Sequence, residues 1–383
     1  MPFIRVACAA AADEPLRIGA LNPLTGAGGQ YGPSMAKVIQ SVAEEINKAG
    51  GIAGRKIEVT VADTQTNPDA GVAAAHKLID VDRVAAVVGT WASAVTTAVA
   101  PLCWESKTML FTVSGADSIT KLPHQGYIIR TQPNTFLQVG RATQFMLDNK
   151  VKRVFSLAAQ TPFAVDSYTR MSAVLKEGGS EAIGQIVYDP KQTSFRSEID
   201  KALAEKPDTL FLNSYAPDLA VLLRELYQAG YEGHRMTQGY AATPTVLSSL
   251  QPALTEGLWS YSPSPDLDSP AYAAVKKLLG NDNPDPYSSQ VYDHTNMIAL
   301  AVAKSGQATG TAIHDTIRQI SQGDGGQAVY SALGGMPLLA QGKSVNYSGA
   351  SGPCDFTPSG DITSCKFRFD IVEGGKQKLL SLS

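Results

Sequence analysis

Two hydrophobic patterns alternate along the first 130 positions of the chain. Short runs of almost entirely apolar residues are followed by longer amphipathic stretches. The runs predict strands buried on both faces of a sheet, and the stretches predict helices that cover those faces. Strands are expected at "RIGALN", "KIEVTVAD", "VAAVVG", "TMLFTV" and "GYIIRT", with helices over about 33–49, from Pro68 onward, and over "SAVTTAVAPLCWES". This order predicts a mostly parallel, doubly wound α/β sheet.

The alternation starts again after "TQPN". Helices and apolar strands follow each other from "TFLQVGRATQFMLDN" to "RMTQ", which predicts a second parallel unit. Further helices are expected at "SPAYAAVKKLLG", "YSSQVYDHTNMIALAVAKSG" and "TAIHDTIRQISQG", and the last 40 residues have the character of a β-hairpin. Because 383 residues are many for a single core, two α/β domains are expected.

Composition narrows the classes of function. The chain is 44% apolar and 17% charged, with a net charge of -3 and no basic tract, so it has no surface suited to nucleic acid. No apolar run reaches the roughly 18 residues of a membrane span, so no membrane insertion is expected. Residues 1–15, "MPFIRVACAAAADEP", are predicted to be the remnant of a secretory signal, the alternative being a disordered alanine-rich terminus.

Two of the four cysteines flank a turn. In "GPCDFTPSGDITSCKF" the residues 358–361 lie midway between Cys354 and Cys365, so a hairpin would place these cysteines opposite each other. Facing Cβ atoms are about 4.5–5.5 Å apart, close to disulfide reach. We therefore predict a disulfide and an oxidising compartment, the alternative being two unrelated thiols. Cys8 and Cys103 are expected to stay unpaired.

The glycine-rich stretch "NPLTGAGGQYGPSM" does not fit a nucleotide-binding loop. Gly26 and Gly28 give G-x-G, but the third glycine position is Tyr31, and Gly32 is followed by Pro-Ser rather than by a Walker lysine. No metalloprotease, hydrolase or C-x-x-C motif is present, and the five histidines have no metal-ligand spacing. We therefore predict a binding protein without catalytic residues, metal or cofactor.

Small polar residues and aromatic residues gather where the predicted strands end. Ligands bind at the carboxyl ends of strands in open α/β sheets, hydroxyl and N–H groups suit a carboxylate there, and aromatic rings suit an apolar or cationic group. Core packing is the alternative for each aromatic residue. The candidates are Trp91, Ser93, Ser114, Gly115, Ala116, Phe163, Tyr215, Gly239 and Tyr240.

The segment "RIGALNPLTGAGGQYGPSMAKVIQSVAEEINKAGGIAGRKIEVTVAD" closely resembles the start of the type I periplasmic solute-binding proteins of the branched-chain amino acid (Leu/Ile/Val-binding-protein-like) transport family. There the pattern runs "G-P-x-T-G-x-x-x-x-x-G…A-x-x-x-I-N-x-x-G-G-I-x-G". The resemblance continues through "DPKQTSFRSEIDKALAEKPDTLFLNSYAPDLAVLLRELYQAG" to "SGPCDFTPSGDI" and covers nearly all of the mature chain.

The resemblance implies two lobes that close on a ligand about a hinge of three crossovers. By composition the crossovers are expected near 131–134, 260–263 and 345–349, so that 16–132 with 263–346 form lobe 1 and 133–262 with 347–383 form lobe 2. It also implies a periplasmic, monomeric component of an ABC importer that contacts a membrane permease, the alternative being a ligand-sensing module of the same fold.

The ligand-binding positions of the family carry over residue by residue. Tyr31 would flank the ligand side chain, and Tyr287 would close the pocket from the first lobe. Ser93 with Trp91 and Ala92, together with residues 114–116, would hold a carboxylate. Phe163 stands where the family often has tyrosine, and Tyr215 matches a family aromatic residue.

One departure from the family pattern concerns the ligand. Amino-acid-binding members usually have an acid on a second-lobe loop to pair with the ligand ammonium group, but this loop reads "TQGYAATP", with Gly239 at about that place. An unpaired buried ammonium group is costly. The resemblance therefore leaves two ligand classes open: a branched-chain or aromatic amino acid, with an acid such as Asp293 substituting, or an aromatic or aliphatic acid without the amino group.

Overall fold

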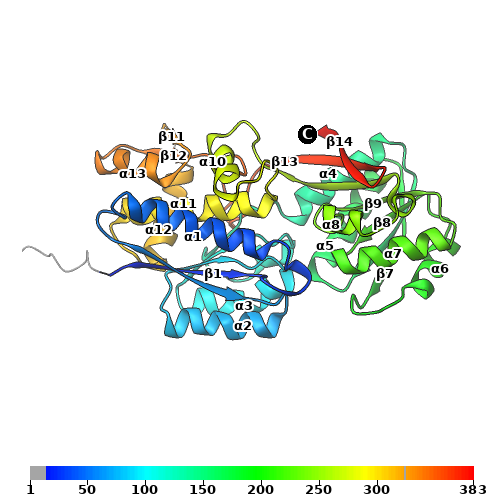
Figure 1. Ribbon diagram of the computed structural model, residues 1–383, viewed down its shortest axis with the longest axis horizontal. Coiled ribbons are helices and arrows are strands. Elements are labelled where there is room, and N and C mark those ends of the chain that lie inside the picture. Colours follow the sequence, from blue (N-terminus) through cyan, green and yellow to red (C-terminus); the bar gives the residue numbers. More distant parts are fainter. Residues whose placement is uncertain (1–13, 323–324) are drawn as a thin grey trace, which may run out of the picture. The chain divides into compact units, whose positions relative to one another are not determined.

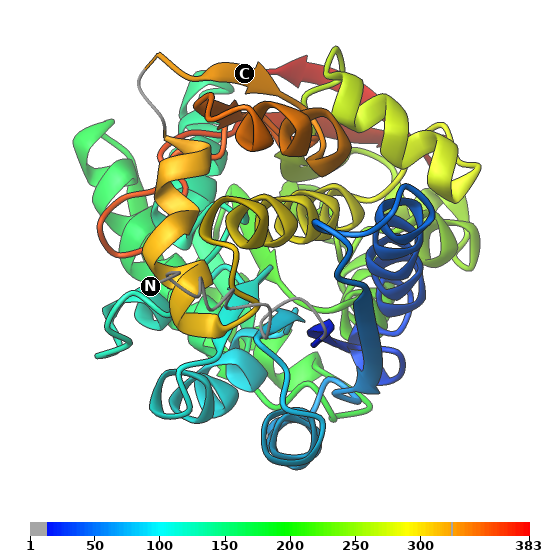
Figure 2. The same cartoon turned by 90° about the vertical axis from the view of Figure 1, so that its left-hand side faces the viewer.

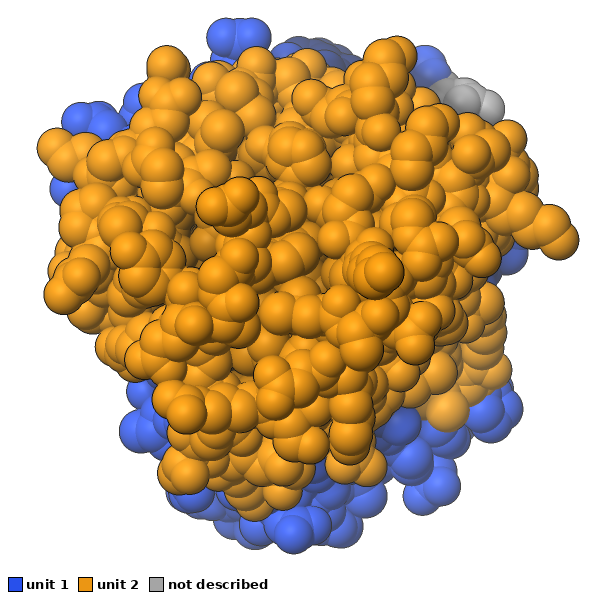
Figure 3. Space-filling view, turned by 90° about the vertical axis from the view of Figure 1, so that its right-hand side faces the viewer, with its two compact units in different colours: residues 1–114, 123–132, 265–363 blue, residues 115–122, 133–264, 364–383 orange. Residues whose placement is uncertain are grey.

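The computed structural model describes residues 14–322 and 325–383, so the predicted signal remnant lies outside the described residues except for its last two positions. The chain divides into two compact units (Figure 3): unit 1 comprises 1–114, 123–132 and 265–363, and unit 2 comprises 115–122, 133–264 and 364–383. The segment 347–363, which the sequence analysis placed in lobe 2, lies in unit 1, and 115–122 lies in unit 2. The hinge itself remains a prediction.

Unit 1 is built on a five-stranded parallel sheet, as predicted. Its strands are β1 (Leu16–Asn22), β2 (Ile57–Asp63), β3 (Ala86–Gly89), β4 (Met109–Thr112) and β5 (Ile128–Ile129), in the order β2-β1-β3-β4-β5. The connecting elements are η1 (Gly26–Gly28), α1 (Gly32–Lys48), α2 (Pro68–His76), η2 (Lys77–Val81) and α3 (Ser93–Glu105). Helices α2 and α3 cover one face, and α1 packs on the other (Figure 1). Because the strand order reverses between β1 and β3, the carboxyl ends of these two strands form a topological switch point.

The second half of unit 1 supplies α10 (Pro270–Leu279), α11 (Pro286–Ser305), α12 (Gly310–Ser321), β11 (Gln327–Val329), α13 (Ala332–Ala340) and β12 (Val345–Tyr347). Helix α11 lies among α1, α10, α12 and α13 (Figure 2). All of its residues over 287–302 are consequently buried, including polar ones. A helix that is covered on all sides needs internal partners for such side chains.

Unit 2 contains a seven-stranded sheet in the order β14-β13-β10-β9-β8-β6-β7. Strands β6 (Arg153–Ala159), β7 (Glu181–Tyr188), β8 (Thr209–Asn213), β9 (His234–Gln238) and β10 (Leu258–Ser264) are parallel, whereas β13 (Lys366–Glu373) and β14 (Lys376–Leu382) form the predicted antiparallel hairpin. The helical segments are η3 (Asp117–Lys121), α4 (Thr135–Asp148), α5 (Pro162–Glu177), α6 (Arg196–Ala204), α7 (Ala216–Gln228), α8 (Pro244–Ser248) and α9 (Pro252–Thr255). The fold class predicted from the sequence is therefore confirmed.

The predicted disulfide between Cys354 and Cys365 is wrong, because among the described residues both cysteines are free thiols. The predicted turn does form, with an antiparallel bridge between Phe356 and Ile362. In this register the position opposite Cys354 is Ser364, one residue short of Cys365. A shift of one residue turns a side chain to the other face of a strand pair. The two cysteines therefore give no support to the predicted oxidising compartment.

The buried His294 of α11 makes the stability of unit 1 depend on pH. Its Nε2 lies 2.9 Å from Thr131 Oγ1, and its ring packs 5.5 Å from that of Phe111. Burial lowers the pKa of His294 to about 3. Because this pKa is below the value of about 6.5 in the unfolded chain, the neutral ring contributes stability that is fully present above pH 6.5 and is lost as the pH falls toward 3.

We therefore expect His294→Gln to reduce the acid sensitivity of the protein. Between pH 7.5 and pH 5 the wild type should lose about 2 kcal/mol more unfolding free energy than the variant, at about 1.4 kcal/mol per pH unit below 6.5. Urea unfolding at both pH values measures this difference. The exposed His76→Gln controls for the loss of one histidine from the unfolded chain. Equal pH dependence in wild type and His294→Gln would contradict the assignment.

Candidate ligand-binding site

The glycine-rich loop after β1 is fixed by the loop after β2. The Asp63 carboxylate accepts hydrogen bonds from Leu24 N–H (2.8 Å), Thr25 N–H (3.2 Å) and the Thr25 hydroxyl (2.6 Å). The Thr66 hydroxyl accepts from Gly28 N–H and donates to Thr25 O, each at 3.0 Å. Partial burial alone would raise the pKa of Asp63, but the hydrogen bonds from Thr25 and from backbone N–H groups outweigh it and lower this pKa. Asp63 therefore joins the loop after β2 to the glycine-rich loop after β1.

Close packing accounts for the glycines of this loop. Gly26 has a φ of 78°, in the left-handed region that favours glycine. A Cβ atom at Gly28 would lie 2.7 Å from the Trp91 ring, and one at Gly32 would lie 2.1 Å from Pro23 O. The glycines therefore let the loop pack against the β3–α3 loop and let α1 begin close to β1. This close packing explains the glycines without a bound phosphate.

The β3–α3 loop is held in a strained conformation by a network of hydroxyl groups. Thr90, buried and β-branched, has a φ of 62°, which is rare for such a residue. Its carbonyl oxygen accepts hydrogen bonds from Thr96 Oγ1 and Thr112 Oγ1, each at 2.9 Å, and one from the Ser114 hydroxyl. Strained residues that are over-determined by their surroundings cluster at ligand sites.

Ser114 lies inside this network instead of at its surface. It is fully buried, and its hydroxyl contacts the carbonyl oxygens of Thr90 and Trp91, the latter at 2.8 Å. Its own carbonyl accepts a hydrogen bond from Arg130 Nη1 at 3.0 Å, and Arg130 Nε pairs with Asp361 at 2.6 Å. We infer that Ser114 positions the β3–α3 loop, whereas the predicted contact of its hydroxyl with a carboxylate has no support from this geometry.

The structure brings three of the predicted residues of unit 1 into one aromatic cluster. The ring of Tyr31 lies 5.6 Å from that of Trp91 and 5.0 Å from that of Tyr287, and Trp91 and Tyr287 are 5.9 Å apart in an edge-to-face arrangement. These residues come from the glycine loop, the β3–α3 loop and the start of α11. Burial, with Tyr287 and Asp285 nearby, raises the pKa of Tyr31 well above its ordinary value. Its hydroxyl is therefore protonated at neutral pH.

The amino terminus of α3 adjoins this cluster in the chain. Ala92 is the N-cap residue and Ser93 the first helical residue, directly after Trp91, and each of the two is less than a tenth exposed. The first N–H groups of a helix have no partners within the helix and carry a partial positive charge. This edge of unit 1 therefore combines aromatic rings with groups that favour an anion.

In unit 2, Gly115 and Phe163 are neighbours. A Cβ atom at Gly115 would lie 2.8 Å from the Phe163 ring and 2.7 Å from Gln138 Nε2. The Gly115 carbonyl accepts hydrogen bonds from Thr135 N–H (2.8 Å) and the Thr135 hydroxyl (3.0 Å). Ala116 is buried at the N-cap of η3. These residues join the starts of α4 and α5.

The remaining predicted residues lie at the ends of β8 and β9. Tyr215 and Tyr240 are half-buried with ring centres 6.1 Å apart, and Gly239 lies between β9 and Tyr240. The nearby Asp218 carboxylate accepts from Tyr215 N–H (2.9 Å) and from the Tyr188 hydroxyl (2.5 Å). Burial raises the pKa of Asp218 to about 6, against the opposing effect of these hydrogen bonds. Its two oxygens already have partners within unit 2.

The suggestion that Asp293 serves as a ligand acid does not fit its surroundings. Its carboxylate is buried and accepts hydrogen bonds from the Tyr347 hydroxyl (2.9 Å), Ala350 N–H (2.7 Å) and Ser351 N–H (2.8 Å). A Cβ atom at Gly349 would lie 2.3 Å from this carboxylate. Burial raises the pKa of Asp293 to about 6. Asp293 therefore holds the 349–351 segment in place.

Sequence reasoning missed a set of buried polar residues at the same strand ends. Asn22 closes β1, Asn213 closes β8, Ser214 follows it, and Gln238 closes β9. Each is at most 3% exposed and has at least one side-chain polar atom without a hydrogen-bond partner in the part of the chain that the structure describes. The only indication of these residues in the sequence is a polar residue at or just after the last position of an apolar strand. From the sequence alone, such a residue cannot be distinguished from the first residue of a loop.

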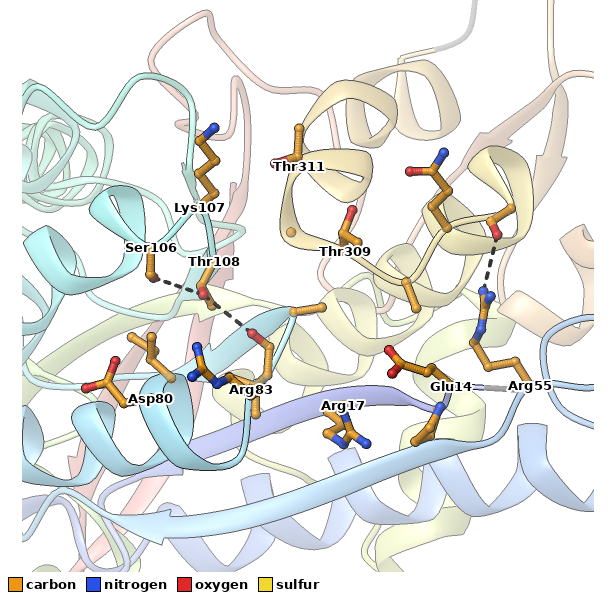
Figure 4. Close-up of a pocket in the computed structure, with 18 residues that line it drawn as sticks. Glu14, Arg17, Arg55, Asp80, Arg83, Ser106, Lys107, Thr108, Thr309 and Thr311 are labelled. Atoms are coloured by element: carbon orange, nitrogen blue, oxygen red, sulfur yellow. Dashed lines mark hydrogen bonds between the residues drawn. The ribbon is translucent and has the colours of Figure 1, made fainter. Parts of the chain in front are cut away.

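A cavity of about 670 Å³ lies at the opposite edge of the unit 1 sheet, where the strands begin (Figure 4). None of the predicted site residues lines it. The basic side chains around it include Arg17, which pairs with Glu58 at 3.4 Å, and Arg55, whose Nη1 donates to Gly306 O at 3.4 Å. We therefore place the candidate site at the carboxyl ends of the strands.

Within the described ranges 14–322 and 325–383, no group of three His, Cys, Asp or Glu side chains is arranged to hold a metal ion. No helix in this part of the chain is long and apolar enough to cross a membrane.

Comparison with known proteins agrees with the fold. A family model described as "Periplasmic binding protein" matches residues 15–359. The Leu/Ile/Val-binding protein BraC3 of Rhizobium johnstonii is 26% identical over 385 residues, which cover 97% of this chain and 95% of the relative.

Two solved structures share the fold over nearly the whole chain. The leucine binding protein LivK of Thermotoga maritima has a TM-score of 0.81 at 20% identity and covers 96% of this chain and 98% of its own. A solute binding protein of an ABC transporter from R. palustris, in complex with 4-hydroxybenzoate, has a TM-score of 0.78 at 18% identity and covers 97% of each chain. Because the family model spans most of the sequence, the chain belongs to the periplasmic binding protein family, a family of solute-binding proteins and not of enzymes.

Proposed function

We propose that this protein is the extracytoplasmic solute-binding component of an ABC importer and captures a small carboxylate. The observation that carries the proposal is the edge of unit 1 where the Tyr31–Trp91–Tyr287 cluster meets the amino terminus of α3. The helix terminus favours the carboxylate, and the aromatic rings favour an apolar body. Delivery to a membrane permease, export through a signal peptide and closure about a hinge belong to the same proposal.

The surroundings of two buried acids, one in each unit, favour a ligand acid without an α-amino group. An ammonium group needs an acidic partner when it is buried. The carboxylates of Asp218 in unit 2 and Asp293 in unit 1 already accept hydrogen bonds within their own units. The similar proteins include both ligand classes, since one is named for leucine and another is in complex with 4-hydroxybenzoate.

Thermal unfolding against a ligand panel tests the proposal. The panel contains branched-chain and aromatic amino acids, benzoates, phenylpropanoids and short aliphatic acids, each with the corresponding amide, which lacks the carboxylate, as a control. A ligand that binds only the folded state raises the midpoint by mass action. We expect carboxylates to raise it and amides to fail. A panel in which no carboxylate raises the midpoint would refute the function.

Two substitutions should weaken binding without unfolding the protein. Ser93→Ala alters the first turn of α3, and Tyr215→Ala removes a half-buried ring at the end of β8, so each should reduce affinity about tenfold, or about 1.4 kcal/mol. Matched controls on the same helices are Thr97→Ala, whose hydroxyl donates to Ser93 O, and Tyr227→Ala, which is 55% exposed. Calorimetric titration with a hit from the panel measures the change. Unchanged affinity in both site variants would remove these residues from the site.

A further inference from the structure

A row of buried polar side chains crosses three neighbouring strands of unit 2. Gln238 of β9 pairs in register with Tyr261 of β10, and Asn213 of β8 lies one position beyond the pair Leu212–Thr237. The three side chains therefore stand on one face of the sheet. Gln238 Nε2 donates to Asn213 Oδ1 at 3.0 Å and to the Tyr261 hydroxyl at 3.3 Å. The row is connected internally.

This row ends in one donor and one acceptor that no group of the described residues satisfies. Among residues 14–322 and 325–383, the buried atoms Asn213 Nδ2 and Gln238 Oε1 have no hydrogen-bond partner, and neither does the adjacent Ser214 hydroxyl. Exchanging the oxygen and nitrogen of both amides leaves the same count, one donor and one acceptor. Such buried groups destabilise a fold, so natural proteins keep few of them.

The row lies just beneath an accessible edge. Ser214 is followed directly by Tyr215, and Gln238 is followed by Gly239 and Tyr240; Tyr215, Gly239 and Tyr240 are each partly exposed. A small molecule that contacts these residues would be within reach of the row. The opposite face of the same strands is closed by the apolar core under α6, α7 and α8, to which Leu210 and Leu212 belong.

The chemistry of the unsatisfied atoms selects one kind of ligand group. A carboxylate only accepts hydrogen bonds and an ammonium group only donates them, whereas a hydroxyl group does both. A hydroxyl would donate to the Gln238 amide oxygen and accept from the Asn213 amide nitrogen. Resting on the proposed capture of a carboxylate, the geometry points to a hydroxyl-bearing acid as the substrate class, with Asn213 and Gln238 as the residues that determine this specificity.

Ligand pairs test this inference, since in two of them one member carries an added hydroxyl and in the third a hydroxyl replaces a methyl group. We would titrate the wild type with benzoate and 4-hydroxybenzoate, phenylalanine and tyrosine, and valine and threonine. The hydroxylated member of at least one pair should bind tenfold or more tightly, because a site built to bond a hydroxyl rejects the analogue without it. If every pair that binds does so within threefold, the inference is overturned while the proposed function stands. If no member of any pair binds but another carboxylate of the panel does, the inference is overturned and the proposed function stands, whereas if no carboxylate of the panel binds, both fail.

A double variant locates the selectivity. Asn213→Leu/Gln238→Met removes both unsatisfied atoms together, so the hydroxylated ligand should bind about tenfold or more weakly while its partner changes by less than threefold. Thr237→Val is the matched control, because its hydroxyl is bonded to Leu212 O at 2.8 Å and it precedes Gln238 in the same strand. The melting midpoint of the double variant should stay close to that of the wild type, because the loss of two unsatisfied atoms offsets the hydrogen bond that the buried Tyr261 hydroxyl loses. Equal weakening of both ligands, or of neither, would overturn the assignment.

Discussion

Arg130→Met should lower the unfolding free energy by about 3–5 kcal/mol, because it leaves the Asp361 carboxylate buried without its cation. Arg130 is fully buried, its Nε lies 2.6 Å from Asp361, and its Nη1 donates to Ser114 O at 3.0 Å. The loss is a large part of the roughly 5–15 kcal/mol that stabilises an ordinary fold. Urea unfolding followed by tryptophan fluorescence measures it, since Trp91 and Trp104 both lie in unit 1.

The double variant Arg130→Met/Asp361→Leu separates the ion pair from packing. Replacing both members of a buried pair by apolar residues is often close to neutral, so most of the stability should return. Arg17→Met is the surface control: Arg17 lies 3.4 Å from Glu58 and both side chains are substantially exposed, so the change should be below about 1 kcal/mol. A loss below about 1 kcal/mol for Arg130→Met would show that the pair does not hold unit 1 together.

The sheets and most helices of the protein could be predicted because their signals are local. Apolar runs bounded by turns gave β1 to β4, and Asn67-Pro68 marked the start of α2, where the Asn67 side chain accepts from two N–H groups. The short α13 (Ala332–Ala340) was missed, since its composition of glycine, proline and apolar residues lacks helical periodicity. The disulfide prediction was wrong because the register of a hairpin depends on how its turn closes, and a shift of one residue moves a side chain to the other face of the strand pair.

The site was predicted less completely than the fold. The family resemblance predicted Tyr31, Trp91 and Tyr287 as ligand-binding residues, and in the structure the centres of their rings lie within 6 Å of one another. The role of a hydroxyl, by contrast, depends on where its proton is directed. The hydroxyl group of Ser114 could in principle donate to a carboxylate, yet in the structure it contacts two backbone carbonyl oxygens. Asn213 and Gln238 were missed because a polar residue at a strand end becomes significant only once its partners are counted.

Trp91→Ala should reduce both stability and ligand affinity, by separable amounts. The side chain is 7% exposed and packs on Tyr31, Tyr287 and the backbone at Gly28. Removing a buried tryptophan costs about 3–5 kcal/mol of unfolding free energy. As the centre of the aromatic cluster it should also account for at least about 2 kcal/mol of binding, or about thirtyfold in affinity.

Trp104→Ala distinguishes the two effects. Trp104 is half-buried at the other end of α3, so its removal should lower stability while affinity stays within about threefold of the wild type. Trp91→Phe keeps an aromatic ring in the cluster and should recover part of both losses. Titrations are made well below the unfolding transition of each variant, so a difference in affinity cannot arise from unfolded protein. If Trp91→Ala loses stability and retains full affinity, the cluster is core packing and the carboxylate site must be sought elsewhere on unit 1.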